Sequence, residues 1–76
     1  SVFRVNASME IKDFCAFFGI RIETELSSLS GWIMERLDRI PAAGDSFVYE
    51  GLRITVASLE HHRPSIVEVE LCAADA

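Results

Sequence analysis

Long hydrophobic runs and clusters of positive charge are both missing from this sequence. The longest uncharged apolar stretch falls far short of the roughly 20 residues that a membrane-spanning helix needs, so no bilayer crossing is expected within the chain. Lys and Arg number 7 against 12 Asp and Glu, which gives a formal net charge of −5. Because phosphate backbones and anionic lipid surfaces are bound through clustered Lys and Arg, nucleic acid is not an expected partner.

Recognisable catalytic and cofactor motifs are also missing. The chain has only four glycines, Gly19, Gly31, Gly44 and Gly51, and their spacing matches neither of the glycine-rich loops that bind nucleotide phosphates. Ser, His and acidic residues are present, but none stands in a nucleophile elbow or a carboxylate pair, so no enzyme is predicted. The glycines are better explained as turns, and Gly31 as a close approach of its helix to a neighbouring element.

Cysteine is scarce, and histidine occurs only as an adjacent pair. Cys15 and Cys72 form neither a CxxC redox pair nor a zinc site, so we expect two free thiols and a reducing, cytoplasmic location. Glu60, His61 and His62 could in principle hold a divalent cation. Adjacent residues rarely face one ion together, and a closed site needs three or four ligands, so we expect a solvated turn and predict no metal site.

The length of 76 residues, with 50% hydrophobic and 25% charged residues, indicates one small domain over residues 1–76. No secretory signal opens the chain, and we expect a domain cut from a longer protein. Hydrophobic periodicity predicts the order β-α-α-β-β-β, with strands over 1–6, 47–50, 52–59 and 65–71. The resulting fold class is α+β, with two layers, a mostly antiparallel sheet and both helices on one face. Ala73 to Ala76 are expected to fray.

The first helix is predicted between a capping Ser8 and a terminating Gly19. Ile11, Phe14 and Phe18 share its apolar face, whereas Phe17 lies on the opposite side. Since nothing in the chain is predicted to cover that side, we expect Phe17 to contribute to an exposed apolar patch.

The second helix and the turn after it are the centre of the predicted fold. Leu29, Ile33 and Leu37 recur on one face, and Trp32 beside them is predicted to be a core residue that does not stack on a flavin or an adenine. The helix is expected to end at Ile40, because proline disfavours helical geometry in the residue before it. In the following turn, Pro41 to Asp45, Gly44 tolerates a positive φ. Asp45 is expected to bond the backbone two residues further on.

The run GWIMERLDRIPAAGDSFVYEGLRITV, over residues 31–56, resembles the transporter-associated domain at the carboxyl end of CorC and HlyC proteins, which are hemolysin-like and magnesium/cobalt efflux proteins. Its most specific part is the I-P-x-x-G-D turn followed at this distance by Y-E-G-L. The chain departs from the family with E-H-H-R-P at 60–64, where many members carry basic residues. The positions that carry the resemblance are Gly31, Trp32, Leu37, Ile40, Pro41, Gly44, Asp45, Tyr49, Gly51, Leu52 and Val56.

The resemblance implies a cytoplasmic accessory domain that follows paired CBS domains and modulates ion transport by the membrane domain of its parent protein. Its expected partners are those CBS and membrane domains, or a second copy of itself in a homodimer, and no cofactor is expected. The family fold is similar to a subdomain of FAD-binding oxidoreductases. A module that binds flavin adenine dinucleotide or an adenine nucleotide is therefore the alternative.

Overall fold

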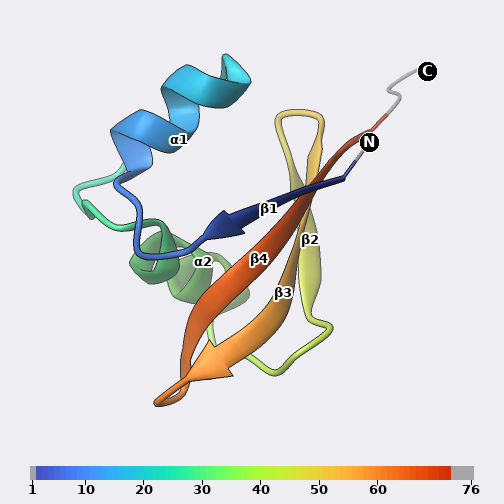
Figure 1. Cartoon of the computed structure of the whole chain (residues 1–76). Coiled ribbons are helices and arrows are strands. Elements are labelled where there is room, and N and C mark those ends of the chain that lie inside the picture. The colour runs from blue at the N-terminus through green and yellow to red at the C-terminus, as the bar shows by residue number, and fades with distance from the viewer. Residues whose placement is uncertain (1, 73–76) are drawn as a thin grey trace.

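Six elements follow one another in the order β-α-α-β-β-β, as the sequence predicted (Figure 1). The computed structural model describes residues 2–72, so the fraying expected at Ala73 to Ala76 lies outside the described residues. Neither of the two helices in this range has the length and apolar character needed to span a membrane. The elements are β1 (Val2–Asn6), α1 (Ile11–Phe18), α2 (Leu29–Leu37), β2 (Ser46–Tyr49), β3 (Leu52–Glu60) and β4 (Arg63–Leu71).

The four strands form one antiparallel sheet in the order β1-β4-β3-β2. The last three strands are joined by two-residue turns, Glu50-Gly51 and His61-His62, in which all four residues have positive φ. Such turns match the right-handed twist of the strands that they connect. The first strand is added at the edge, beside β4. The last strand therefore lies beside the first, and the carboxyl end of β1 is next to the start of β4.

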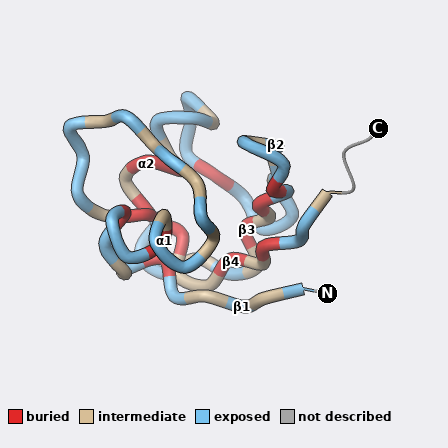
Figure 2. The backbone as a smooth tube through the Cα atoms, turned by 90° about the horizontal axis from the view of Figure 1, so that it is seen from above, coloured by how far each residue is buried: buried red, intermediate tan, exposed pale blue. Residues whose placement is uncertain are grey.

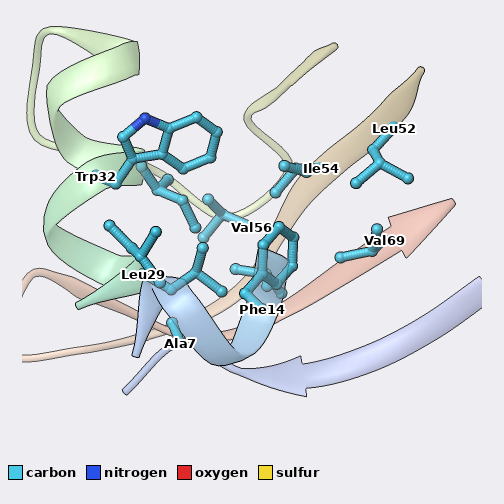
Figure 3. Close-up of a cluster of buried hydrophobic side chains, with 11 residues drawn as sticks. Ala7, Phe14, Leu29, Trp32, Leu52, Ile54, Val56 and Val69 are labelled. Atoms are coloured by element: carbon cyan, nitrogen blue, oxygen red, sulfur yellow. The ribbon is translucent and has the colours of Figure 1, made fainter. Parts of the chain in front are cut away.

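Both helices pack on one face of the sheet, and the core lies between the two layers (Figures 2 and 3). Strand residues alternate between this face and solvent, because successive side chains on a strand point to opposite sides. The solvent face carries charged pairs such as Arg4 and Glu68, whose side chains are 2.8 Å apart. The buried hydrophobic residues are Ala7, Ile11, Phe14, Leu29, Trp32, Ile33, Leu52, Ile54, Val56, Val67 and Val69.

The predicted cap of α1 is wrong. The residue in the capping position is Glu10, whose side chain makes no capping hydrogen bond. Ser8 instead donates both its backbone N–H and its hydroxyl to Asn6 Oδ1, at 2.9 and 2.7 Å. A local side-chain turn of this kind competes with helix capping for the same polar groups. The predicted end is confirmed, since Gly19 has φ +69° and donates its N–H to Cys15 O at 2.8 Å.

The second helix ends earlier than predicted. Its last residue is Leu37, and Asp38 terminates it in the left-handed conformation, with its N–H donating to Met34 O at 2.9 Å. Aspartate tolerates this conformation, so the helix stops before the proline forces it to. Ile40, which was expected to be helical, is 68% exposed.

The strand predictions differ from the structure mainly at the ends. The strand β4 begins two residues before the predicted start, because the turn after β3 contains only His61 and His62. Leu71 alternates with the buried Val67 and Val69, and this alternation predicts that it points inward. It is opposite Leu52 in the register and on the same side of the sheet, yet it is 57% exposed. The described pairing of β1 with β4 ends at Glu70, so β1 does not flank Leu71.

Candidate functional site

The indole of Trp32 is closed into the core between α2 and the sheet (Figure 3). The residue is 3% exposed, and its ring packs edge-on against Phe47 at 5.5 Å and Tyr49 at 5.0 Å between centroids. The Arg36 guanidinium covers Tyr49 from outside, 5.0 Å from the ring centroid. The Tyr49 hydroxyl donates to Arg21 O at 3.3 Å. These contacts tie α2, β2 and the segment between the helices together, and they leave the indole no open face for a ligand.

The turn from Pro41 to Asp45 is held by its own hydrogen bonds. Asp45 Oδ2 accepts from Arg39 Nη1 at 2.7 Å and from the Ala42 N–H at 2.8 Å. The expected bond to the backbone two residues further on is therefore wrong, because the carboxylate reaches back three residues. Gly44 has φ +97°, a conformation that favours glycine. The Gly44 N–H donates to Val56 O, and the Val56 N–H donates to Asp45 O, both at 2.8 Å. These two hydrogen bonds fix the turn to β3.

The hydrogen bond from Arg39 lowers the pKa of Asp45, and the bond from the Ala42 N–H lowers it further. Folding therefore favours the ionised carboxylate, and this stabilisation is lost as pH falls below the ordinary aspartate pKa of about 3.9 and through the lower folded value. We expect Asp45→Asn to lower the melting temperature at pH 7 and the difference from the parent chain to shrink as the pH falls below about 4. Thermal melts from pH 7 down to about pH 2 measure this, with the exposed Glu25→Gln as a charge control. A difference that stayed constant with pH would contradict it.

The remaining positions of the motif have structural roles in turns, in a helix start or in packing. A Cβ on Gly31 would lie 3.2 Å from Ser28 Oγ, so the close approach is to the serine that caps the same helix, and the expected approach to a neighbouring element is wrong. Gly51 has φ +79° in the turn between β2 and β3. Leu37 is half-buried and packs against the core. The motif thus combines packing residues and turn residues from different places in the fold.

An aromatic cluster on the outside of α1 leaves a large apolar side chain exposed to solvent. We name it the Phe17 surface, and it consists of Phe3, Phe17 and Phe18. Phe17 is 65% exposed, as the sequence predicted, and its ring meets Phe3 edge-on at 5.7 Å and Phe18 at 4.9 Å. Beneath it, Phe14 is fully buried against Phe18. The exposed ring is therefore held in place by an aromatic base that reaches from α1 to β1.

Two pockets were not foreseen from the sequence. An apolar groove of about 520 Å³ runs between α1 and the segment 20–27, and Ile11, Cys15 and Ile22 line it. A polar pocket of about 340 Å³ lies at the start of α2, beside the turn between β3 and β4. The groove is formed by neighbouring segments within residues 10–27, whereas the polar pocket combines segments distant in the sequence, which no motif within one segment could have indicated.

The adjacent histidines form the turn between β3 and β4. Both side chains are exposed, and their φ values of +54° and +66° leave them on a tight hairpin end. Within residues 2–72, no group of three or more His, Cys, Asp or Glu side chains is placed so that it could hold a metal ion. Cys15 and Cys72 are both free and half-buried.

Comparison with solved structures identifies the fold. A CorC_HlyC domain from Haemophilus ducreyi superimposes with a TM-score of 0.89 at 16% identity, over 97% of this chain and 92% of that one. The putative Mg²⁺ and Co²⁺ transporter (CorC) associated region from Neisseria meningitidis gives 0.85 at 27%, over 92% and 88%. A hemolysin domain from Enterococcus faecalis gives 0.85 at 22%, over 93% and 88%.

No curated protein sequence matches the chain significantly. The family model of the transporter associated domain, CorC_HlyC, matches residues 1–72, which is nearly the whole chain. This match includes the turn, the Trp32 packing and the hairpin from which the resemblance was first drawn. The chain therefore belongs to the CorC_HlyC family of transporter associated domains.

Proposed function

We propose that this domain is a regulatory accessory domain of a CorC-like magnesium or cobalt transport protein. It acts by packing through the Phe17 surface against another domain of its parent protein or against a second copy of itself. Family membership and the likeness to the Neisseria meningitidis transporter-associated region support the transport context. The expected partners are the CBS and membrane domains of the parent protein, with the domain in the cytoplasm.

The observation that carries this proposal is the ordered exposure of Phe17. A phenylalanine that is 65% exposed leaves most of its apolar surface in water, where it contributes little to folding. Its edge-on contacts with Phe3 and Phe18 hold the ring in one orientation. A rigid, exposed aromatic side chain loses little conformational entropy on association, and aromatic residues, phenylalanine among them, are enriched in protein interfaces.

Ion flux through the intact parent protein in vesicles tests the proposal. Phe17→Ser is expected to change the rate of Mg²⁺ or Co²⁺ flux by at least about fivefold, equivalent to about 1 kcal/mol of lost contact. Val48→Ser is the matched control, because Val48 is 55% exposed and points to the solvent face of the sheet. Equal ion flux in the unsubstituted parent protein and in both variants would contradict the proposal. Light scattering of the same variants separates docking within the parent from self-association.

The alternative of a flavin or adenine-nucleotide module draws less support from the geometry. The one tryptophan of the chain, the best stacking surface for such a ring, is covered by Phe47 and Tyr49. We therefore propose an interaction domain that requires no cofactor of its own. Saturating FAD at ~100-fold its Kd would add about 2.7 kcal/mol of stability if the alternative held, and a thermal shift would reveal it.

A further inference from the structure

The polar pocket of about 340 Å³ brings together three parts of the chain that are far apart in the sequence. We name it the Arg63 pocket. Its volume is at the lower end of the range for small-ligand sites. The end of β1, the start of α2 and the hairpin between β3 and β4 enclose it, and its lining residues include Asn6, Ser28, Ser30, Glu60, His61 and Arg63.

Ser30 is a buried polar residue, only 5% exposed, and its hydroxyl lines this pocket. Its oxygen accepts a hydrogen bond from Arg63 Nη2 at 3.0 Å, and the Ser28 oxygen accepts one from the Gly31 N–H at 3.2 Å. Each hydroxyl still has a proton to donate. Among the described residues, the only acceptor recorded for either proton is the oxygen of the other serine. The two oxygens are 3.5 Å apart, which is long for a hydrogen bond. At least one hydroxyl proton therefore lacks a protein acceptor.

The guanidinium of Arg63 has N–H donors that no group among the described residues uses, and the residue is exposed at the edge of the pocket. A guanidinium has five N–H donors, and one of those on Arg63 is used by Ser30. Within residues 2–72, no carboxylate lies within 4.0 Å of Arg63, as is also true of Arg36 and Arg53, whereas the other four basic side chains have such a partner. The pocket therefore offers a charged donor with open N–H groups beside a buried hydroxyl, and a negatively charged oxygen can accept from both.

The helix terminus itself contributes no free amide to this arrangement. The N–H groups of Leu29 and Ser30 donate to Met9 O and Ala7 O, at 3.0 and 2.8 Å, and that of Gly31 is used by the capping serine. Only the positive end of the helix dipole adds to the side-chain donors. The Glu60 carboxylate also lines the pocket and opposes a bound anion.

We propose that the Arg63 pocket binds a phosphate-type oxyanion, either free inorganic phosphate or the phosphoryl group of a larger molecule. Arg63 supplies the charged donor, and Ser30 supplies the hydroxyl donor from inside the pocket. The proposal is independent of the Phe17 surface, which is built on α1 and β1, and of what docks there.

Titration of the ¹⁵N-labelled chain with inorganic phosphate, at constant ionic strength against chloride, tests the site. Saturable shifts are expected at residues 28–31 and 61–65. Arg63→Gln is expected to weaken binding at least about tenfold, the loss of one charge-assisted bond. Arg53→Gln, which removes the same charge from the solvent face of the sheet, is expected to change the Kd less than about twofold.

Two further variants keep the proposal testable if Arg63→Gln perturbs the fold. Glu60→Gln is expected to tighten phosphate binding several-fold because it removes a negative charge from the lining, and a purely structural role of the pocket would not produce this gain. Ser30→Ala is expected to weaken binding without changing the net charge. Linear shifts that do not saturate, or equal losses in Arg63→Gln and Arg53→Gln, would overturn the proposal in favour of a pocket that holds only water.

AMP and adenosine distinguish the two sources of the anion. If free phosphate is the ligand, we expect equal affinity for phosphate and AMP, with chemical-shift changes confined to the pocket. A larger phosphorylated ligand predicts at least about tenfold tighter binding of AMP, equivalent to about 1.4 kcal/mol, with additional shifts beyond the pocket. Binding of adenosine as tightly as AMP, without the phosphoryl group, would refute the oxyanion site.

Discussion

Replacing Trp32 with alanine is expected to leave the domain largely unfolded at room temperature. Truncation of a buried tryptophan costs about 3–5 kcal/mol, through lost apolar burial and the cavity that remains. The indole is 3% exposed and in contact with two aromatic rings of β2, so little of the cavity can collapse without moving the strand. A domain of this size has a total stability of roughly 5 kcal/mol.

Urea denaturation followed by circular dichroism measures this loss. Trp32→Phe is the matched control, because it keeps an aromatic ring against Phe47 and Tyr49 and should cost about half as much or less. A Trp32→Ala chain with the parental denaturation midpoint would show that the indole is not part of the core. The intrinsic fluorescence of the parent chain should be blue-shifted in the native state and shift to the red on unfolding.

Phe14→Ala is expected to cost about 3–5 kcal/mol, whereas Phe17→Ala should cost about 1 kcal/mol or less. The two residues are three positions apart on the same helix, but Phe14 is fully buried and Phe17 is 65% exposed. Denaturation midpoints of the two variants provide the comparison. Equal losses would mean that the Phe17 ring is needed for folding, and the reason to assign it to an interface would disappear.

The element order and the buried faces could be predicted from hydrophobic periodicity alone. Alternation of apolar and polar residues along β3 predicts that Leu52, Ile54 and Val56 point inward, and all three are buried. The helix ends were less predictable, because several residue types can cap or terminate a helix. Ser8 was a good candidate for capping and bonds Asn6 instead, and Asp38 terminates α2 before the proline does.

The candidate sites differed in how far the sequence could reveal them. The exposure of Phe17 was predictable, since a large apolar residue away from the buried face of a short helix is left largely in solvent. The Arg63 pocket was not, because its donors come from α2 and from a hairpin more than 30 residues later in the chain. Only the antiparallel return of β4 beside β1 brings these segments together.

Photocrosslinking within the intact parent protein tests the central proposal most directly. A photoreactive phenylalanine analogue at position 17 places the reactive group on the Phe17 surface, and the same analogue at Val48 places it on the solvent face of the sheet. We expect irradiation to join position 17 to another domain of the parent protein or to a second copy, at a peptide that mass spectrometry identifies, and to give no such product from position 48. Efficient crosslinking from position 48, with none from position 17, would contradict the account.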